Sequence, residues 1–323
     1  MSPFTSFLAR RLLFALVLVL LVSSGSMWLV HLAPGDFVTQ LRGPGVSADT
    51  VQRERERLGL DRPLIEQYGQ WLVGLVQLDL GTSYRFGRPV NELVGVRAKN
   101  TAVLAATALF VATVVGIPLG VIAGSSPAGA LVSTIRGVSV LGMSLPPLLT
   151  SLLLALFAAR TGWFPIGGMT SLRAVDPGLP ATLVDIGWHL VLPALALALP
   201  VAATLERLLA QSMRETLDEP FILAALARGI PRRRVVWRHA LRVAIRPVAG
   251  IYGVIVGSLL SGSFAVELVT AWPGLGRLMF DALMSRDVQL VAGCAVVGSL
   301  FLACGNLLSD LGLAAADPRL REE

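Results

Sequence analysis

The sequence predicts an all-α polytopic membrane protein with six transmembrane helices. Three observations favour this fold class. The mean hydropathy is +0.71, and 54% of the residues are hydrophobic. Only 15% are charged, whereas a soluble domain has about 25%. Charge-free intervals of about 20 residues recur along the chain, and each is long enough to cross the hydrocarbon core of a bilayer as a helix. A chain this apolar cannot cover a globular surface with polar groups, so we expect a membrane as its solvent.

The first predicted span is residues 12–30, which directly follow Arg10 and Arg11. Its apolar stretch is too long for the hydrophobic region of a signal peptide, and "VHLAPGD" after it has no A-x-A cleavage pattern. We therefore expect a retained membrane anchor.

Residues 31–99 are expected to form an external helical insertion between the first and second spans. "DRPLIEQYGQWLVGLVQ" (61–77) repeats its apolar residues at helical spacing, with Asp61 as N-cap and Pro63 in the first turn. "VQRERERLG" (51–59) predicts a charged helix before it. Two interpretations stay open: an insertion that only packs, and a docking surface for an external partner.

Five more spans follow from the charge-free intervals. The third should be kinked at Pro146 and Pro147, because proline interrupts helical hydrogen bonding. Arg136 is the one charge that lies away from an edge of any predicted span. The expected ranges are 100–123, 130–159, 185–206, 246–267 and 287–310.

Arginine distribution predicts the orientation. Six crossings place both termini on one side, together with Arg10, Arg11 and segment 207–247, which contains nine arginines. Short loops rich in arginine stay in the cytoplasm. Both termini are therefore expected to be cytoplasmic.

The arginine-rich loop contains two predicted helices. "EPFILAALARG" (219–229) is a short helix with Asp218 as N-cap, Pro220 in its first turn and Gly229 at its left-handed C-terminal position. A second helix begins at Pro231, where the inward-facing residues should be Val235, Val236, Leu241 and Ala244. Either a partner grips this loop, or the loop only fixes the topology.

The fifth span, "YGVIVGSLLSGSFAVE", contains several small and hydroxyl-bearing residues. They could line a hydrated path or permit close helix packing, and both interpretations stay open. Glu267 at its predicted outer end could contact a substrate or a binding protein, or be solvated. The candidate path residues are Ser258, Ser261, Ser263 and Glu267.

Several classes of function are disfavoured. No Walker A loop, H-E-x-x-H motif or other catalytic constellation occurs, and His31, His189 and His239 fall at three different predicted boundaries. We therefore expect no catalytic residue, no metal site and no cofactor in this chain. The net charge of +6 comes without a nucleic-acid-binding motif, so we expect no nucleic acid partner.

"AALARGIPRRRVVWRHALRVAIRP" (224–247) resembles the EAA loop of permease subunits of binding-protein-dependent ABC importers. Ala224, Ala225, Gly229 and Pro247 stand at motif positions, whereas Leu223 replaces the motif's glutamate. Arg242 stands where a proline is expected, and both departures are similar to the dipeptide/oligopeptide/nickel branch. Other blocks similar to this branch follow in order along the whole chain, among them "LAPGD", "LGLDRPLIEQYGQWL", "DLGTSY", "WPGLGRLMFDAL", "RDVQLVAG" and "DPRLR".

The resemblance implies the transmembrane-domain fold of type I ABC importers. It implies an anchor helix plus insertion (1–99), a core (100–314) with a cytoplasmic coupling loop (212–247), and a cytoplasmic tail (315–323). A coupling helix would sit in a groove of an ATPase subunit, with the basic helix beside it near anionic headgroups or acidic partner residues. The coupling residues implied are Phe221, Ala224, Ala225, Arg228, Gly229, Pro231 and Arg232.

The function that the resemblance implies is that of a non-catalytic permease subunit in the bacterial inner membrane. Its partners would be a homologous second permease, two ATPase subunits that bind ATP and Mg²⁺, an extracytoplasmic substrate-binding protein and membrane lipid. Short peptides are the expected cargo, and nickel chelates, glutathione or other small solutes are alternatives.

Three other classes of protein fit the residues less well. A stand-alone secondary transporter usually keeps intramembrane charges, which these predicted spans lack apart from Arg136. A membrane enzyme would need a buried polar cluster. A structural scaffold would not explain the ordered family blocks.

Overall fold

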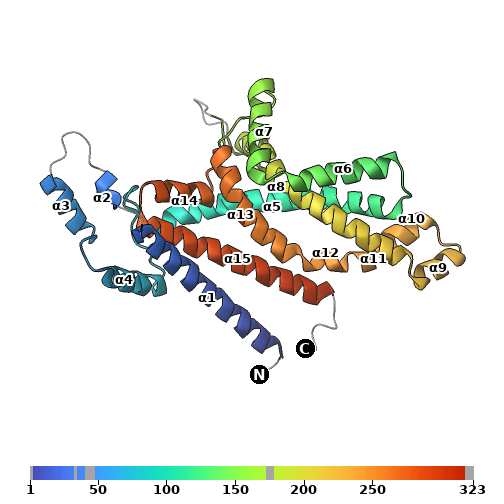
Figure 1. Ribbon diagram of the computed structural model, residues 1–323, viewed down its shortest axis with the longest axis horizontal. Coiled ribbons are helices and arrows are strands. Elements are labelled where there is room, and N and C mark those ends of the chain that lie inside the picture. The colour runs from blue at the N-terminus through green and yellow to red at the C-terminus, as the bar shows by residue number, and fades with distance from the viewer. Residues whose placement is uncertain (1–2, 33–34, 41–47, 172–177, 317–323) are drawn as a thin grey trace. The chain divides into compact units, whose positions relative to one another are not determined.

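The computed structural model describes residues 3–32, 35–40, 48–171 and 178–316, and its regular elements are all helices (Figure 1). The described residues form two compact units. The first unit comprises residues 1–9, 102–272 and 304–323, and the second comprises 10–101 and 273–303. The predicted tail, 315–323, lies outside the described residues from position 317 onward.

Among the described residues, five helices are long and apolar enough to cross a membrane. They are α1 (Pro3–Leu32), α5 (Val90–Ser125), α8 (Gly178–Leu217), α13 (Tyr252–Val269) and α15 (Val288–Ala316). A sixth crossing is present if α6 (Ala130–Ser144) and α7 (Pro147–Thr161) count as one broken span. The prediction of an all-α polytopic protein is confirmed.

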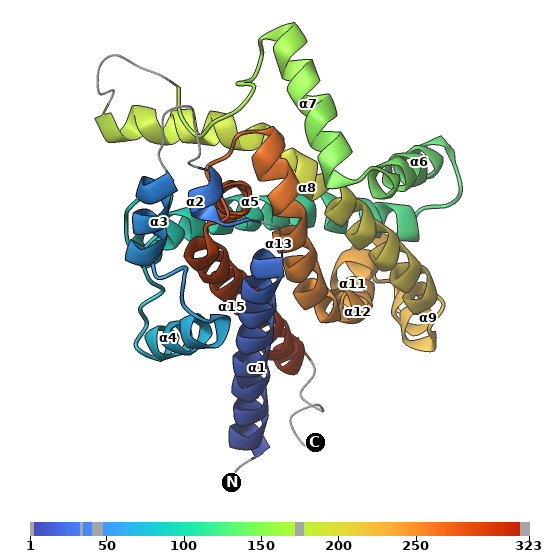
Figure 2. The same ribbon diagram turned by 60° about the vertical axis from the view of Figure 1, so that its left-hand side comes forward.

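The predicted third span is broken where the sequence suggested a kink. The axes of α6 and α7 differ by 106°, and Figures 1 and 2 show the corner between them. Leu145 and Pro146 have extended backbone, with ψ of 113° and 147°. Each of them precedes a proline, which disfavours helical conformation, and neither Pro146 nor Pro147 has an amide hydrogen to donate.

In the first unit, α5 runs alongside α8 (Figures 1 and 2) with glycines at the contact. A Cβ added to Gly116, Gly120 or Gly124 would lie 2.7–2.9 Å from a backbone oxygen of α8. The two backbones can approach this closely because hydrogen replaces a side chain at every fourth position, a common device in membrane helices. Helices α6, α7 and α13 also pack against α8, which is the centre of this unit.

Helix α8 is much longer than the predicted fourth span. Asp185 and Glu206 were expected at the ends of the span, but both lie inside the helix and are buried. Hydropathy identifies only the apolar part of α8. Packing against α5 and α6 stabilises the helix beyond that part.

The second unit contains the external insertion, whose helices are α2 (Phe37–Gln40), α3 (Ala48–Arg57) and α4 (Leu64–Val76). Helix α14 (Leu275–Met284) belongs to the same unit. The N-cap of α4 is Pro63 and not Asp61, because the chain between these residues is still outside the helix. Trp71 of α4 is buried in the core of this unit, whereas Ile65 and Val76 are exposed, so the apolar stripe is narrower than predicted.

Within this unit, α1 and α15 are antiparallel. The last turn of α1 and the first turn of α15 line one cavity, through Val30, His31, Leu32 and Val288. Val19 and Val296, further along the two helices, belong to the same core.

The loop between α8 and α13 is helical throughout most of its length. Its elements are α9 (Pro220–Ala227), α10 (Arg232–Arg234), the π-helical turn η1 (Val235–Ala240), α11 (Leu241–Ala244) and α12 (Arg246–Gly250). All of them belong to the first unit.

Candidate functional site

Helix α9 begins and ends close to the residues that the sequence predicted. Pro220 occupies the first turn, and the N-cap is Glu219, one residue later than the predicted Asp218. Gly229 has φ of +77°, the left-handed conformation that the sequence predicted. Its amide donates to Leu226 O at 2.9 Å and that of Ile230 donates to Ala225 O at 3.3 Å. These two bonds form a Schellman motif, which turns the chain sharply after α9.

One side of α9 is anchored and the other side is open. Ile222 is buried in the core of the first unit, together with Leu209 and Met213 of α8. Three large apolar side chains on α9 are 39–59% exposed, although they lie outside the apolar spans: Phe221, Leu223 and Leu226. We call these three residues the α9 patch. Large apolar side chains that are exposed outside the membrane spans are typical of interaction sites.

The basic segment after Gly229 is attached by its apolar residues. Val235, Val236 and Ala244 are buried as predicted, and Leu241 is partly buried. The η1 turn is wider than an α-helical turn and lies inside this segment; such turns frequently occur at functional sites. Arg232 donates from Nη2 to Ser125 O at the C-terminus of α5, at 3.1 Å. That contact is favourable because helix C-termini carry partial negative charge.

The arginines of this segment line an open groove of about 630 Å³. Trp237 also lines it and is 44% exposed. A groove with planar cationic groups and an indole face suits acidic side chains or phosphates, because guanidinium donates two parallel hydrogen bonds to either. The lining residues are Pro231, Arg233, Arg234, Trp237 and Arg238.

The structure brings the predicted coupling residues together on α9 and the turn after it. All of them are exposed except Ala225, which is partly buried. They are Phe221, Ala224, Ala225, Arg228, Gly229, Pro231 and Arg232. The predicted set did not include Leu223, Leu226 or Trp237, although each is an exposed apolar side chain inside a polar loop.

The predicted path residues are divided between two faces of α13. Ser258 and Ser261 lie on the exposed face with Val254, whereas Ser263 and Glu267 are buried. The hydroxyls of Ser258 and Ser263 donate to carbonyls of their own helix at 2.8 and 2.9 Å. The four residues therefore do not form one lining.

Gly262 of α13 fits the alternative interpretation of close helix packing. A Cβ added there would lie 3.3 Å from Leu197 of α8 and 3.4 Å from Pro147 of α7.

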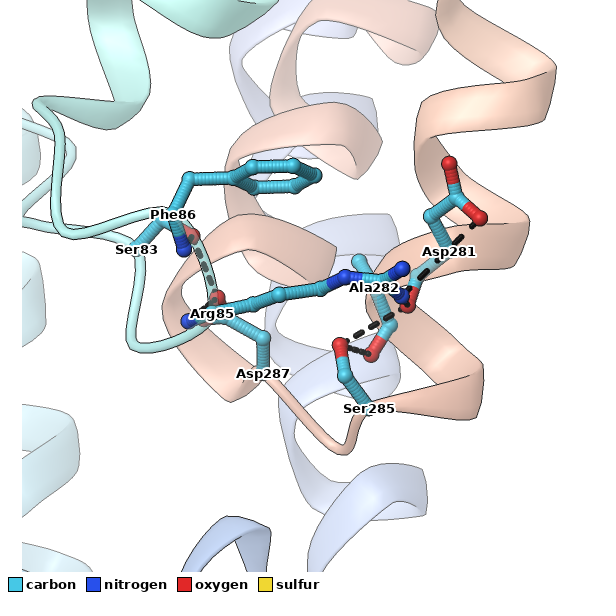
Figure 3. Close-up of polar contacts among 7 residues, drawn as sticks. All are labelled: Ser83, Arg85, Phe86, Asp281, Ala282, Ser285 and Asp287. Atoms are coloured by element: carbon cyan, nitrogen blue, oxygen red, sulfur yellow. Dashed lines mark hydrogen bonds and ion pairs between the residues drawn. The ribbon is translucent and has the colours of Figure 1, made fainter.

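A polar cluster in the second unit was not predicted (Figure 3). The carboxylate of Asp287 is fully buried and accepts hydrogen bonds from Ser83 Oγ at 2.6 Å, Arg85 N at 3.1 Å and Leu290 N at 3.1 Å. Arg85 reaches across to α14, where it donates to Asp281 O at 3.0 Å (Figure 3). The contacts join the end of the insertion to the turn between α14 and α15.

Tyr84 lies next to this cluster, outside the membrane spans. Burial raises the pKa of its phenol; a hydrogen bond with Gln289 partly offsets this effect, and the nearby Asp287 carboxylate adds to it. Tyr84 therefore stays neutral at physiological pH. The cluster could not be found from the sequence, because the blocks "DLGTSY" and "RDVQLVAG" that form it are about 200 residues apart and neither contains a recognised ligand motif.

Two protein-family descriptions match the chain. Residues 116–322 match the family described as "Binding-protein-dependent transport system inner membrane component". Residues 4–105 match the description of the N-terminal membrane component of such systems. Together the matches include the predicted anchor span, the whole insertion and the whole loop that contains α9.

Characterised relatives align over nearly the full length. The chain is 33% identical over 317 residues to "Oligopeptide transport system permease protein AppB" of Bacillus subtilis (strain 168), covering 98% of this chain and 99% of that protein. It is 32% identical over 335 residues to "Dipeptide transport system permease protein DppB" of Escherichia coli (strain K12), with 98% and 99% coverage.

A solved structure supports the fold. The inward-facing MetNI methionine ABC transporter matches with a TM-score of 0.53 and 16% identity, covering 70% of this chain and 96% of that chain. At this identity, the likeness concerns the fold alone.

Proposed function

Because the chain belongs to the family of inner-membrane components of binding-protein-dependent transport systems, we propose that it is a permease subunit of an ATP-driven importer of short peptides. Two relatives that align over nearly its whole length are named as oligopeptide and dipeptide permeases. In this proposal the chain catalyses no reaction and binds no ATP or Mg²⁺; partner ATPases hydrolyse the nucleotide.

The observation that carries the proposal is the α9 patch with the turn that follows it. A helix anchored by Ile222 and open on its other side can be gripped by an ATPase groove and transmit force to α8. The Schellman turn at Gly229 holds α9 at a defined angle to the basic segment. Movement of α9 would therefore be passed to the core of the first unit instead of being absorbed by a flexible loop.

The arginine groove would orient the ATPase. Its positive charge attracts acidic residues of a partner and makes their association faster and more specific. Trp237 offers a flat, partly exposed ring beside these charges, and such residues often dominate interface energetics. In this arrangement the α9 patch supplies the apolar contact and the groove supplies the charged rim.

Other partners follow from the membrane part of the chain. A second permease would cover the exposed face of α13, on which Ser258 and Ser261 lie, so that the two chains enclose one path. A substrate-binding protein would deliver the cargo at the outer side. The antiparallel arrangement of α1 and α15 supports our expectation that both termini lie on one side of the membrane. The arginine-rich loop favours the cytoplasm as that side.

Replacing Gly229 tests the coupling role. We expect Gly229→Val to lower peptide transport by the assembled importer at least tenfold, because a β-branched residue is strained at φ of +77°. Membrane insertion should be unchanged, since a Cβ at this position meets nothing within 4 Å. The measurement is ATP-driven peptide uptake into proteoliposomes, with co-purification of the ATPases as a second readout.

Gly162 offers a matched control. It has φ of +66° at the C-terminal end of α7, and a Cβ there also meets nothing within 4 Å. Gly162→Val should impose the same kind of strain but leave transport within about twofold of wild type. Normal transport by Gly229→Val would show that α9 does not couple the ATPase to the permease.

A further inference from the structure

The second unit contains a cavity of about 420 Å³ at the predicted outer end of α1. This volume is typical of sites for small organic molecules. One part of its wall is apolar and includes Val30, Leu32, Leu60, Leu64 and Val288. The other part is polar and includes His31, Asp36, Arg62, Gln67 and Arg286.

Arg286 is the most unusual member of this wall. Its Nη1 atom is buried and has no hydrogen-bond partner among the residues that the structure describes. The guanidinium lies against the backbone of Gly35, where an added Cβ would be 2.8 Å from Nη1. Burying a guanidinium donor without an acceptor is unfavourable. A ligand with an acceptor atom would supply the hydrogen bond that Nη1 of Arg286 lacks.

The charges around the cavity favour an anion. Among the lining residues that the structure describes, the acidic one is Asp36, which is already ion-paired with Arg55 at 2.8 Å and accepts from Thr39 N at 2.8 Å. Arg62 lies 3.6 Å from Glu66, and its side chain is about half exposed. Two arginines therefore line the cavity, and the carboxylate of Asp36 is already paired with a residue outside the lining.

Two further polar side chains complete the polar wall. Nδ1 of His31 donates to Met27 O at 2.8 Å, which makes Nε2 the acceptor nitrogen of the neutral imidazole. Gln67 is held in place by donating to Arg62 O at 2.9 Å. A polar wall of this kind opposite an apolar wall suits a small molecule with a carboxylate at one end and hydrocarbon at the other.

We propose that this cavity binds the carboxylate of a small organic acid, with Arg286 and Arg62 as its partners. Arginine pairs with carboxylate through two parallel hydrogen bonds, and Leu64 and Val288 contact the hydrocarbon part of the ligand. The C-terminus of a short peptide is the carboxylate that fits the imported cargo, and this identification rests on the proposed function. The cavity is then a peptide-binding site on the outer part of the permease itself, separate from the binding protein.

The test measures binding of dialanine, dialanine amide and propionate to the assembled permease pair in nanodiscs, without the binding protein, by isothermal titration calorimetry. Dialanine and propionate should bind, and the amide at least tenfold more weakly, because it lacks the carboxylate. Arg286→Gln and Arg62→Gln should each weaken dialanine binding at least tenfold. Arg53→Gln is the matched control, since Arg53 is an exposed arginine of the same insertion and pairs with Asp49 at 2.7 Å.

Two results would overturn the site: equal binding of dialanine and its amide, or wild-type affinity in the arginine variants. If the Arg286→Gln variant does not assemble, dialanine binding by Arg62→Gln tests the site instead. The Arg62 side chain is half exposed, so its replacement leaves no buried gap. A wrong assignment of short peptides as the cargo would give a different result. Propionate would still bind through Arg286, whereas dialanine would neither bind nor be transported by the complete importer.

Discussion

Individual residues at helix ends determine how this chain turns. Gly229 could be predicted, because the preference for glycine after a helix C-terminus depends only on local backbone geometry. The N-caps Asp61 and Asp218 were predicted two and one residues too early, since a helix can begin at any of several neighbouring residues and the sequence locates its start only to within one or two of them. Asp287 could not be predicted to bind Ser83, because nothing local indicates a partner 204 residues away.

Replacing Asp287 tests the polar cluster. We expect Asp287→Ala to lower the free energy of unfolding by about 2–4 kcal/mol, because it leaves the buried Ser83 hydroxyl and the backbone amides of Arg85 and Leu290 without their acceptor. Thermal unfolding of the detergent-solubilised protein measures the change.

Asp281→Ala is the control for this prediction. The Asp281 side chain is 37% exposed and only 3.9 Å from Arg85, so its loss should cost less than about 1 kcal/mol. Equal destabilisation by both substitutions would show that the buried carboxylate has no special role.

At the scale of whole elements, hydropathy located the spans but not their ends. It detected the apolar part of α8 and missed that the helix continues from Gly178 to Leu217. The proline pair suggested a kink at Pro146 and Pro147, where the structure has a corner of 106°. The length of α8 depends on its packing partners, and a single sequence does not reveal which helices touch.

The glycine contact between α5 and α8 is the clearest example of such packing. We expect Gly116→Ala to destabilise the protein by about 1–3 kcal/mol, because the new methyl group would lie 2.7 Å from Ala202 O and 3.0 Å from Leu205 Cβ. The loss should appear as a lower midpoint of thermal unfolding and a lower yield of folded protein.

Gly137→Ala provides the comparison within another membrane helix. Gly137 lies inside α6, and a Cβ there meets nothing within 4 Å. Because alanine is the better helix former, this substitution should leave stability unchanged or raise it slightly. A harmless Gly116→Ala would mean that α5 and α8 do not pack closely.

At the scale of the whole molecule, the family and the fold class could be predicted from the sequence. The residues that line the translocation path could not. The resemblance of the arginine-rich loop to an EAA motif indicated the family, which the full-length relatives confirm. The four candidate path residues were chosen by chemistry alone, and the structure divides them between an exposed and a buried face of α13. In the proposed function, a second permease would cover the exposed face.

Cysteine labelling tests this role of α13. In a background without Cys294 and Cys304, Ser258→Cys and Ser261→Cys should react with small water-soluble thiol reagents in the assembled importer. The reaction rate should change at least threefold when ATP is added, because alternating access opens and closes the path. Ser263→Cys, which is buried against the chain's own core, should react slowly in both states. ATP-independent labelling at all three positions would exclude α13 from the path.

The corner between α6 and α7 has a consequence for the surrounding lipid. Each of these helices has 15 residues, which makes a rod about 22 Å long, whereas the hydrocarbon layer is about 30 Å thick. Neither rod reaches from one surface to the other. With their axes turned by 106°, one of them lies almost flat whenever the other stands upright. At this place the bilayer must become thinner, or another polypeptide must occupy the missing depth.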